Sequence, residues 1–153
     1  MTNQIEKTIT LKAPIARVWR AITDAAEFGS WFRVKLDGAF APGEVSRGHM
    51  TYPGYEHLVW EARIERMEAQ HLFSFTWHPY AVDPKVDYSS EPSTLVEFRL
   101  EASEGGTRLT ITETGFDALP AHRREEAFVR NEGGWTTQVQ NIAAHLEAAD
   151  VQS

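Results

Sequence analysis

Hydrophobic residues recur along this chain with two different periods, and the change of period divides it into helices and strands. Two segments have apolar residues three and four positions apart, which is the spacing of one helix face. The first comprises Ile15, Val18, Trp19 and Ile22, and the second comprises Trp135, Val139, Ile142 and Leu146. Pro14 pre-sets the first turn of the earlier helix. The later pattern predicts a helix over 120–149 whose four apolar residues face the concave side of a sheet.

Apolar and polar residues alternate between these helices and in one segment before them, as in half-buried strands. The predicted strands span residues 5–11, 32–37, 44–52, 58–67, 72–77, 94–100 and 109–112. A short second helix or packed turn is expected over 24–32. Hairpin links favour an antiparallel sheet, and the helices do not alternate with the strands, so the pattern predicts the α+β class. A curved sheet wrapped around a terminal helix leaves a hollow, which is the best indication of function in this sequence.

Three segments depart from these simple patterns. Residues 79–92 have no hydrophobic period and form a connection longer than most. We expect this connection to border the hollow and to be more mobile than the strands that it joins. Inside a helix, each glycine lowers helix stability by about 1 kcal/mol relative to alanine. Gly133 and Gly134 in succession therefore predict a kink or a break in the last helix, or a close approach of its backbone to another part of the molecule. Residues 123–126 are expected to be a solvated helix start.

Composition narrows the classes of function. A chain of 153 residues fits one domain, residues 1–153. The net charge of −7 disfavours nonspecific binding of nucleic acid and docking on anionic lipid, since both depend on Lys and Arg. Cysteine is absent, which excludes disulfides, thiol nucleophiles and cysteine-ligated metals. No segment has the apolar length of a membrane span, and the first residues lack a signal-peptide pattern. We therefore expect a cytoplasmic protein.

Motifs for cofactors and metals are also absent from the sequence. There is no glycine-rich dinucleotide or P-loop motif and no Gly-x-Ser-x-Gly, so no cofactor is predicted. The six histidines are His49, His57, His71, His78, His122 and His145. No two of them have a metal-ligand spacing such as His-x-His, so no metal site is predicted.

Two groups of residues at the ends of the chain resemble a known family. The opening group is Ala13-Pro14, Val18-Trp19, Ala21-Ile22-Thr23-Asp24 and Trp31-Phe32. The closing group is Gly106-Thr107-Arg108-Leu109-Thr110-Ile111-Thr112-Glu113, Gly115-Phe116, Asn131 and Gly134-Trp135. In this order they resemble the START-like, helix-grip (SRPBCC) superfamily, and within it the Hsp90-ATPase-activator-homologue-like group.

This resemblance implies both a fold and a range of functions. The implied fold is a curved seven-stranded antiparallel sheet that grips a long C-terminal helix, with two short helices after the first strand. An elongated apolar cavity is expected between sheet and helix. Members of the superfamily bind hydrophobic small molecules, act as polyketide cyclases or, in the eukaryotic co-chaperone, dock on Hsp90.

Glu113 is the sharpest candidate for chemistry, because its alternation with Leu109 and Ile111 places it on the cavity face. A carboxylate there is costly unless it is paired. It is a candidate ligand anchor or general acid/base, or else a carboxylate held at the strand end by Arg or backbone amides. The expected ligand-binding set comprises Trp60, Phe75, Trp77, His78, Val96, Phe98, Ile111, Glu113, Trp135 and Val139.

Three functions remain open at this stage. The leading interpretation is a noncatalytic protein that binds a small hydrophobic or aromatic molecule between the sheet and the C-terminal helix. The alternative is a cyclase- or lyase-type enzyme in which Glu113 and a histidine or tyrosine act as acid and base; the tyrosines are Tyr52, Tyr55, Tyr80 and Tyr88. A module that contacts an Hsp90-like chaperone is a third alternative, and a homodimer is also open.

Overall fold

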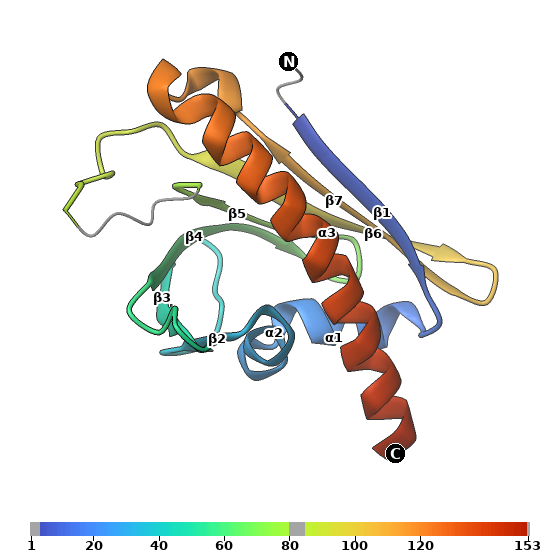
Figure 1. The fold of residues 1–153 in the computed structure, drawn as a ribbon. Helices are drawn as coiled ribbons and strands as arrows, with labels where there is room; N and C mark the ends of the chain where they lie inside the picture. Colours follow the sequence, from blue (N-terminus) through green and yellow to red (C-terminus); the bar gives the residue numbers. More distant parts are fainter. Residues whose placement is uncertain (1–3, 80–84, 153) are drawn as a thin grey trace.

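An antiparallel sheet curves around the C-terminal helix (Figure 1). The computed structural model describes residues 4–79 and 85–152, with side chains described up to residue 148. In chain order the elements are β1 (Gln4–Leu11), α1 (Ile15–Thr23), α2 (Ala25–Phe32), β2 (Val34–Leu36), β3 (Val45–Met50), β4 (Val59–Glu68), β5 (Leu72–Trp77), β6 (Thr94–Ser103), β7 (Gly106–Thr114), the 3-10 turn η1 (Phe116–Ala118) and α3 (Ala121–Gln152). The predicted α+β helix-grip fold is confirmed.

The seven strands have the order β1-β7-β6-β5-β4-β3-β2. Strands β2 to β7 follow one another as antiparallel neighbours, and β1 closes the order by pairing with β7. β2 is shorter than the predicted strand over 32–37, because Phe32 ends α2 and Arg33 caps that helix with φ 68°. This left-handed residue turns the chain from the helix into the edge of the sheet.

α3 packs one face of its length against the sheet, as the spacing of its apolar residues predicts. Trp135, Ile142 and Leu146 are buried, and Val139 is half-buried against the same core. The expected interruption at Gly133 and Gly134 is wrong in two respects. The helix runs unbroken through both residues, and a Cβ at either would meet no atom within 4 Å.

Among the described helices, none has the length and apolar character that crossing a membrane requires.

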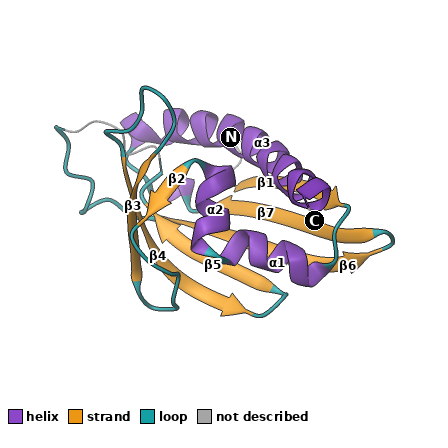
Figure 2. Cartoon of the chain, turned by 90° about the horizontal axis from the view of Figure 1, so that it is seen from below, coloured by secondary structure: helices purple, strands orange, loops and turns teal. Residues whose placement is uncertain are grey.

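Phenylalanine rings fill the middle of the space between the sheet and the helices. Phe28, Phe73, Phe75 and Phe98 are fully buried. Their ring centroids lie 6.5 Å apart for Phe28 and Phe73, and 6.2 Å apart for Phe75 and Phe98. Figure 2 shows α1 and α2 lying across one end of the concave side, with α3 next to them. The described core is therefore packed at this point rather than hollow.

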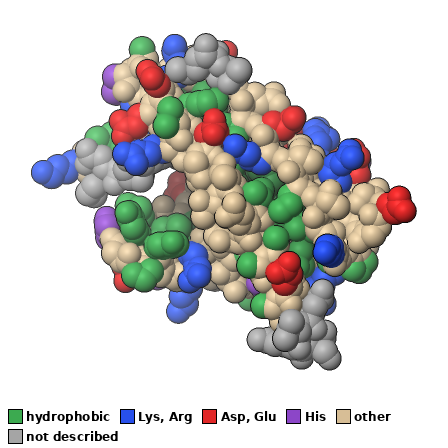
Figure 3. Space-filling view, turned by 45° about the vertical axis from the view of Figure 1, so that its right-hand side comes forward, with side chains coloured by type: hydrophobic (Ala, Val, Ile, Leu, Met, Phe, Trp, Pro, Cys, Tyr) green, Lys and Arg blue, Asp and Glu red, His purple; other side chains and the backbone are tan. Residues whose placement is uncertain are grey.

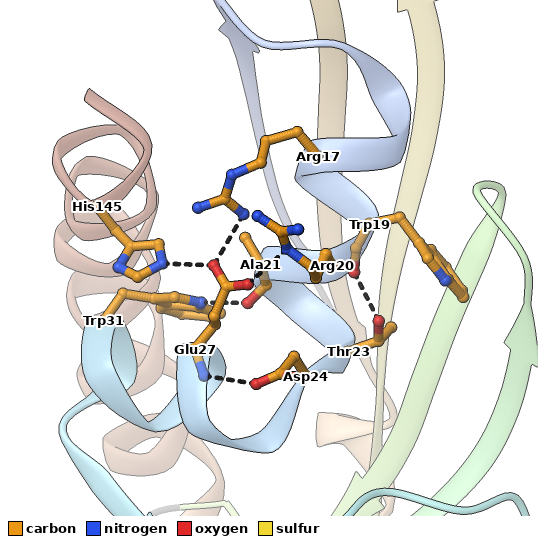
Figure 4. A network of polar contacts seen from close by, with 9 residues as sticks. All are labelled: Arg17, Trp19, Arg20, Ala21, Thr23, Asp24, Glu27, Trp31 and His145. Atoms are coloured by element: carbon orange, nitrogen blue, oxygen red, sulfur yellow. Dashed lines mark hydrogen bonds and ion pairs between the residues drawn. The ribbon is translucent and has the colours of Figure 1, made fainter. Parts of the chain in front are cut away.

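A carboxylate ties the three helices together at that end (Figure 4). The Glu27 cluster comprises Glu27 of α2, Arg17 and Arg20 of α1, and His145 of α3. A carboxylate oxygen of Glu27 lies 2.8 Å from Arg17 Nη1 and 2.9 Å from His145 Nε2, and the other accepts from Arg20 Nε at 2.9 Å. Burial raises the pKa of Glu27, but hydrogen bonds from His145 and the arginines outweigh it and hold the pKa below its ordinary value.

Candidate functional site

Four aromatic side chains converge where the fully buried core gives way to the surface. Phe32 ends α2, Trp60 lies near the start of β4, Trp77 ends β5, and Trp135 projects from α3. Ring centroids are 5.1 Å apart for Phe32 and Trp60, 5.5 Å for Trp60 and Trp77, and 5.9 Å for Trp77 and Trp135. We call these four rings the aromatic wall. They bring together helix and strand ends that are distant in the sequence.

Behind the wall, Glu113 of β7 is fully buried and accepts hydrogen bonds from side chains of three elements. Its Oε1 accepts from Trp135 Nε1 at 2.9 Å, and its Oε2 accepts from Trp77 Nε1 at 2.7 Å and Thr94 Oγ1 at 2.5 Å. Asn131 Nδ2 lies between the two oxygens, at 3.0 and 3.2 Å. The carboxylate thereby fixes two indoles of the aromatic wall in orientation.

All four partners of Glu113 are neutral. The two indole N–H groups can only donate, so they match a carboxylate that only accepts. Among the described residues no Lys or Arg contacts this carboxylate, and several hydrogen bonds compensate its burial instead. The parity that placed Glu113 beside Leu109 and Ile111 is confirmed, because all three are fully buried. Arg or backbone amides were expected as its partners, but among the described residues the side chains of Trp77, Trp135, Asn131 and Thr94 hold the carboxylate.

Two adjoining cavities lie against the aromatic wall, and we call them together the cleft. The smaller has a volume of about 180 Å³ and is lined by Phe32, Met50, Trp77, Asn131, Gly134, Trp135 and Gln138. The larger has a volume of about 450 Å³ and is lined by Phe32, Met50, Leu58, Val59, Trp60, Glu61, Trp77, His78, Asp87, Tyr88, Ser89 and Asn131. The space-filling view shows the molecule hollowed on one side, with hydrophobic side chains gathered along one edge (Figure 3).

The connection after β5 borders the larger cavity, as expected from the sequence. Asp87, Tyr88 and Ser89 line it, whereas residues 80–84 of the predicted segment lie outside the described residues. Arg123 of α3 holds this connection by an ion pair with Glu91 at 2.8 Å, with both side chains nearly buried.

Further contacts fix the same connection. Arg123 also donates to the Pro79 carbonyl at 3.0 Å and lies 4.7 Å from the centroid of the Tyr88 ring. His78 Nε2 lies 3.1 Å from the Glu91 carbonyl oxygen. The expectation of a solvated helix start at residues 123–126 is therefore wrong for Arg123, because this guanidinium reaches back across the connection.

The structure separates the predicted binding residues into three groups. Trp60, Trp77, His78 and Trp135 line the cleft. Phe75, Val96, Phe98 and Ile111 are fully buried in the core and line neither cavity. Glu113 lies behind the wall, and Val139 is half-buried on α3. The predicted set therefore contains both the surface of the cleft and the layer beneath it.

The sequence reasoning missed several residues that line the smaller cavity. Asn131, Gly134 and Gln138 belong to α3, and they lie four residues before, one before and three after Trp135. Positions three and four apart share a helix face, so Asn131 and Gln138 could have been found from that spacing. Phe32 and Met50 gave no comparable signal, because each lies at the end of an element.

The remaining candidates for acid/base chemistry are dispersed. Tyr52 and Tyr55 are exposed and contact each other, with ring centroids 6.2 Å apart. Tyr88 and His78 line the larger cavity, and Tyr80 lies outside the described residues. Among the residues that the structure describes, no three His, Cys, Asp or Glu side chains gather as a metal site would need.

Comparisons with known proteins agree with this architecture. Residues 12–147 match the family model described as Activator of Hsp90 ATPase homolog 1-like protein. No curated protein sequence matches the chain significantly.

Solved structures of low sequence identity share the fold. DynU16, a protein from the dynemicin biosynthetic locus, has a TM-score of 0.75 at 19% identity, covering 97% of this chain and 49% of that one. This chain thus spans about half the length of DynU16. Protein MLL2253 from Mesorhizobium loti has a TM-score of 0.75 at 21% identity, with 95% and 97% covered. A protein from Arthrobacter aurescens has a TM-score of 0.77 at 19% identity, with 95% and 87% covered.

Proposed function

The chain belongs to the family of Activator of Hsp90 ATPase homolog 1-like proteins, and from this premise we propose that it binds a small hydrophobic or aromatic molecule in the cleft without transforming it. The observation that carries the proposal is the aromatic wall, two of whose rings are held by one buried carboxylate. Ligand pockets are typically concave, largely apolar and formed before binding.

The fixed orientation of two rings in the aromatic wall supports a role in binding as well as in packing. The indoles of Trp77 and Trp135 are oriented by hydrogen bonds to Glu113 at 2.7 and 2.9 Å, so they lose little freedom when a ligand arrives. A site fixed in advance reduces the ordering cost of association. Asn131 and Gln138 add polar groups to a mostly apolar lining, which would orient the ligand.

The alternative of a cyclase- or lyase-type enzyme is less well supported. A general acid or base must come within hydrogen-bond reach of its substrate. Glu113 is fully buried, is engaged by four donors and lines neither cavity. An enzyme would have to use His78 or Tyr88, which line the larger cavity. Contact with an Hsp90-like chaperone rests on the family description alone.

Two glycines of α3 allow a matched test of the cleft. Both glycines are exposed, but only Gly134 lines the smaller cavity, and Gly133 lines neither cavity. A Cβ meets no atom within 4 Å at either position. Gly134→Leu should therefore fill the smaller cavity, and Gly133→Leu should leave it open. Both substitutions should favour the helix by up to about 1 kcal/mol.

The experiment combines native mass spectrometry with a neutral fluorescent probe. Native mass spectrometry of the purified protein would detect a small molecule that co-purifies. N-phenyl-1-naphthylamine is titrated into the unchanged protein and both variants. We expect at least about tenfold weaker binding to Gly134→Leu than to Gly133→Leu, corresponding to about 1.4 kcal/mol. Equal binding to all three proteins, or no binding to any, would contradict the proposed function.

A further inference from the structure

We propose that the ligand of the cleft carries a positive charge, as a small organic cation such as a substituted ammonium group held against the aromatic wall. This inference rests on the proposed function, because it names the chemical class that the same site selects. Three features of the described residues carry it: the charge around the cleft, the hydrogen bonding of the indoles, and the size of the smaller cavity.

The described lining of the cleft contains two carboxylates and one histidine, His78, which lies 3.1 Å from the Glu91 carbonyl oxygen. Among the described lining residues there is no Lys or Arg, whereas Glu61 and Asp87 both belong to the larger cavity. A hydrogen bond from Ser89 holds the pKa of Asp87 below its ordinary value, so Asp87 stays charged. Glu61 is exposed and lies 3.3 Å from Arg47, which weakens its contribution. Arg123, on the side of the connection, is paired with Glu91.

The buried charge of Glu113 adds to this pattern from behind the wall. No described cation contacts its carboxylate, and its hydrogen bonds come from neutral donors. Three of these donors, Trp77, Asn131 and Trp135, themselves line the smaller cavity. One layer of side chains therefore separates a carboxylate that has no described counter-ion from the space where a ligand would lie. Low local polarity strengthens its attraction for a cation.

Hydrogen bonding to the carboxylate also acts on the rings. The face of an aromatic ring carries negative potential and attracts cations, most strongly for tryptophan. An indole whose N–H donates to a carboxylate is polarised toward a more negative ring, because hydrogen-bonded groups polarise one another. Trp77 and Trp135 donate to the two oxygens of the same carboxylate, at 2.7 and 2.9 Å. Both rings line the smaller cavity and are therefore suited to contact a cation.

The smaller cavity also has a suitable size. Its volume is about 180 Å³, well above the roughly 10–15 Å³ that a cavity needs to hold one water molecule. A compact ammonium head with three or four methyl groups fits such a space. Longer substituents would extend into the adjoining larger cavity, which shares Phe32, Met50, Trp77 and Asn131 with it.

The test compares choline with 3,3-dimethylbutan-1-ol, its neutral analogue in which carbon replaces the charged nitrogen. The two molecules have nearly the same shape, so a difference in affinity reports on the charge. We expect choline to bind the unchanged protein at least about tenfold more tightly, the range for a partly desolvated cation over tryptophan. Isothermal titration calorimetry in about 0.5 M NaCl suppresses weak attraction to the acidic surface.

Two variants with equal net charge locate the binding site. Gly134→Lys places a tethered cation in the cleft and should abolish choline binding, whereas Gly133→Lys places the same charge outside it and should leave binding unchanged. Glu113→Gln should reduce the preference for choline over its analogue. Because loss of these hydrogen bonds can unfold that variant, the comparison of the two ligands on the unchanged protein decides the question.

The outcomes separate this inference from the proposed function. Equal or tighter binding of the neutral analogue, or no measurable binding of choline, would overturn the preference for a cation. Choline binding that responds equally to both lysine variants would overturn it as well. In each case, N-phenyl-1-naphthylamine binding that is weakened by Gly134→Leu alone would still support a ligand-binding cleft for neutral molecules.

Discussion

Two glutamates at opposite ends of the concave side illustrate two ways of holding a carboxylate in this fold. Glu27 lies among Arg17, Arg20 and His145, and about a fifth of its side chain is exposed. Glu113 is fully buried and is held by two indoles, an amide and a hydroxyl. The first carboxylate is compensated by charge, and the second by neutral hydrogen bonds.

This difference gives the two regions different roles. In the Glu27 cluster, Arg17 and Arg20 compensate the carboxylate, and the contacts link α1, α2 and α3, so the cluster serves the packing of the helices. Glu113 organises the aromatic wall and leaves its negative charge uncompensated by any described cation. A carboxylate of the second kind can influence what lies on the other side of the wall. Four substitutions or conditions test this contrast.

The largest effect is expected for Glu113→Leu. This change leaves two indole N–H groups, an amide and a hydroxyl without their acceptor in a buried place. We expect the free energy of unfolding to fall by about 3–5 kcal/mol, because each unpaired buried donor costs about 1–3 kcal/mol and relaxation recovers part of it. Urea denaturation followed by tryptophan fluorescence measures it.

The control for that substitution is Glu101→Leu, which removes an exposed carboxylate from the neighbouring strand β6. This substitution should change the free energy of unfolding by no more than about 0.5 kcal/mol. A Glu113→Leu protein as stable as Glu101→Leu would show that the neutral donors do not depend on the carboxylate.

A smaller loss is expected for Glu27→Gln. The amide oxygen can still accept a hydrogen bond, but Arg17 loses a charged partner at 2.8 Å in a half-buried place. We expect the free energy of unfolding to fall by about 1 kcal/mol. This value lies between those for exposed ion pairs and for hydrogen bonds to buried charges. Glu147→Gln, at an exposed position of α3, is the control. If Glu27→Gln lost as much unfolding free energy as Glu113→Leu, the two carboxylates would not differ in the way proposed.

The stability contributed by Glu27 should depend on pH in the acidic range, because charged partners hold this carboxylate. Its pKa in the folded protein lies below the ordinary value of 4.5, so the unfolded chain binds more protons in acid. The stability that Glu27 contributes is present above about pH 4.5 and is lost as the pH falls through the lower folded-state pKa. The unfolding free energy of the unchanged protein should therefore decline more steeply below about pH 4.5 than that of Glu27→Gln. Parallel declines in urea titrations between about pH 6 and pH 3 would contradict this assignment.

The smallest effect is expected for Arg20→Ala. Arg20 pairs with Glu27 at 2.9 Å, but 63% of its side chain is exposed. Exposed ion pairs contribute less than about 1 kcal/mol and weaken in salt. We expect the free energy of unfolding to fall by less than about 0.5 kcal/mol, and we expect this difference to disappear in about 1 M NaCl. A larger loss that persists in salt would mean that Arg20 acts through packing of its stem.

Much of the fold was predictable because it depends on local periodicity. The apolar stripe of Trp135, Ile142 and Leu146 faces the core, and the alternation of Leu109, Ile111 and Glu113 places all three inside. The side chains of a strand alternate between its two faces, and those of a helix repeat every three or four residues. Burial follows from these spacings once one side of the element is covered. The order of elements was therefore readable from the sequence.

The arrangement of the cleft was less predictable. Four of the ten expected binding residues line it, while Phe75, Val96, Phe98 and Ile111 lie in the packed core. Alternation identifies the inner face of a strand, but not how far along that face the packing is complete. The expectation for Arg123 failed for a similar reason, because its partner Glu91 lies 32 residues earlier in the chain.

The sequence by itself determined which side chains turn inward, since that depends on the spacing of neighbours along one element. Only the tertiary structure decided what those side chains meet. Glu113 takes its donors from positions 18, 19, 22 and 36 residues away, on β5, β6 and α3. Such contacts depend on strand register and on the position of α3 against the sheet. These are properties of the whole packed chain, and they convert a buried carboxylate into the support of an aromatic cleft.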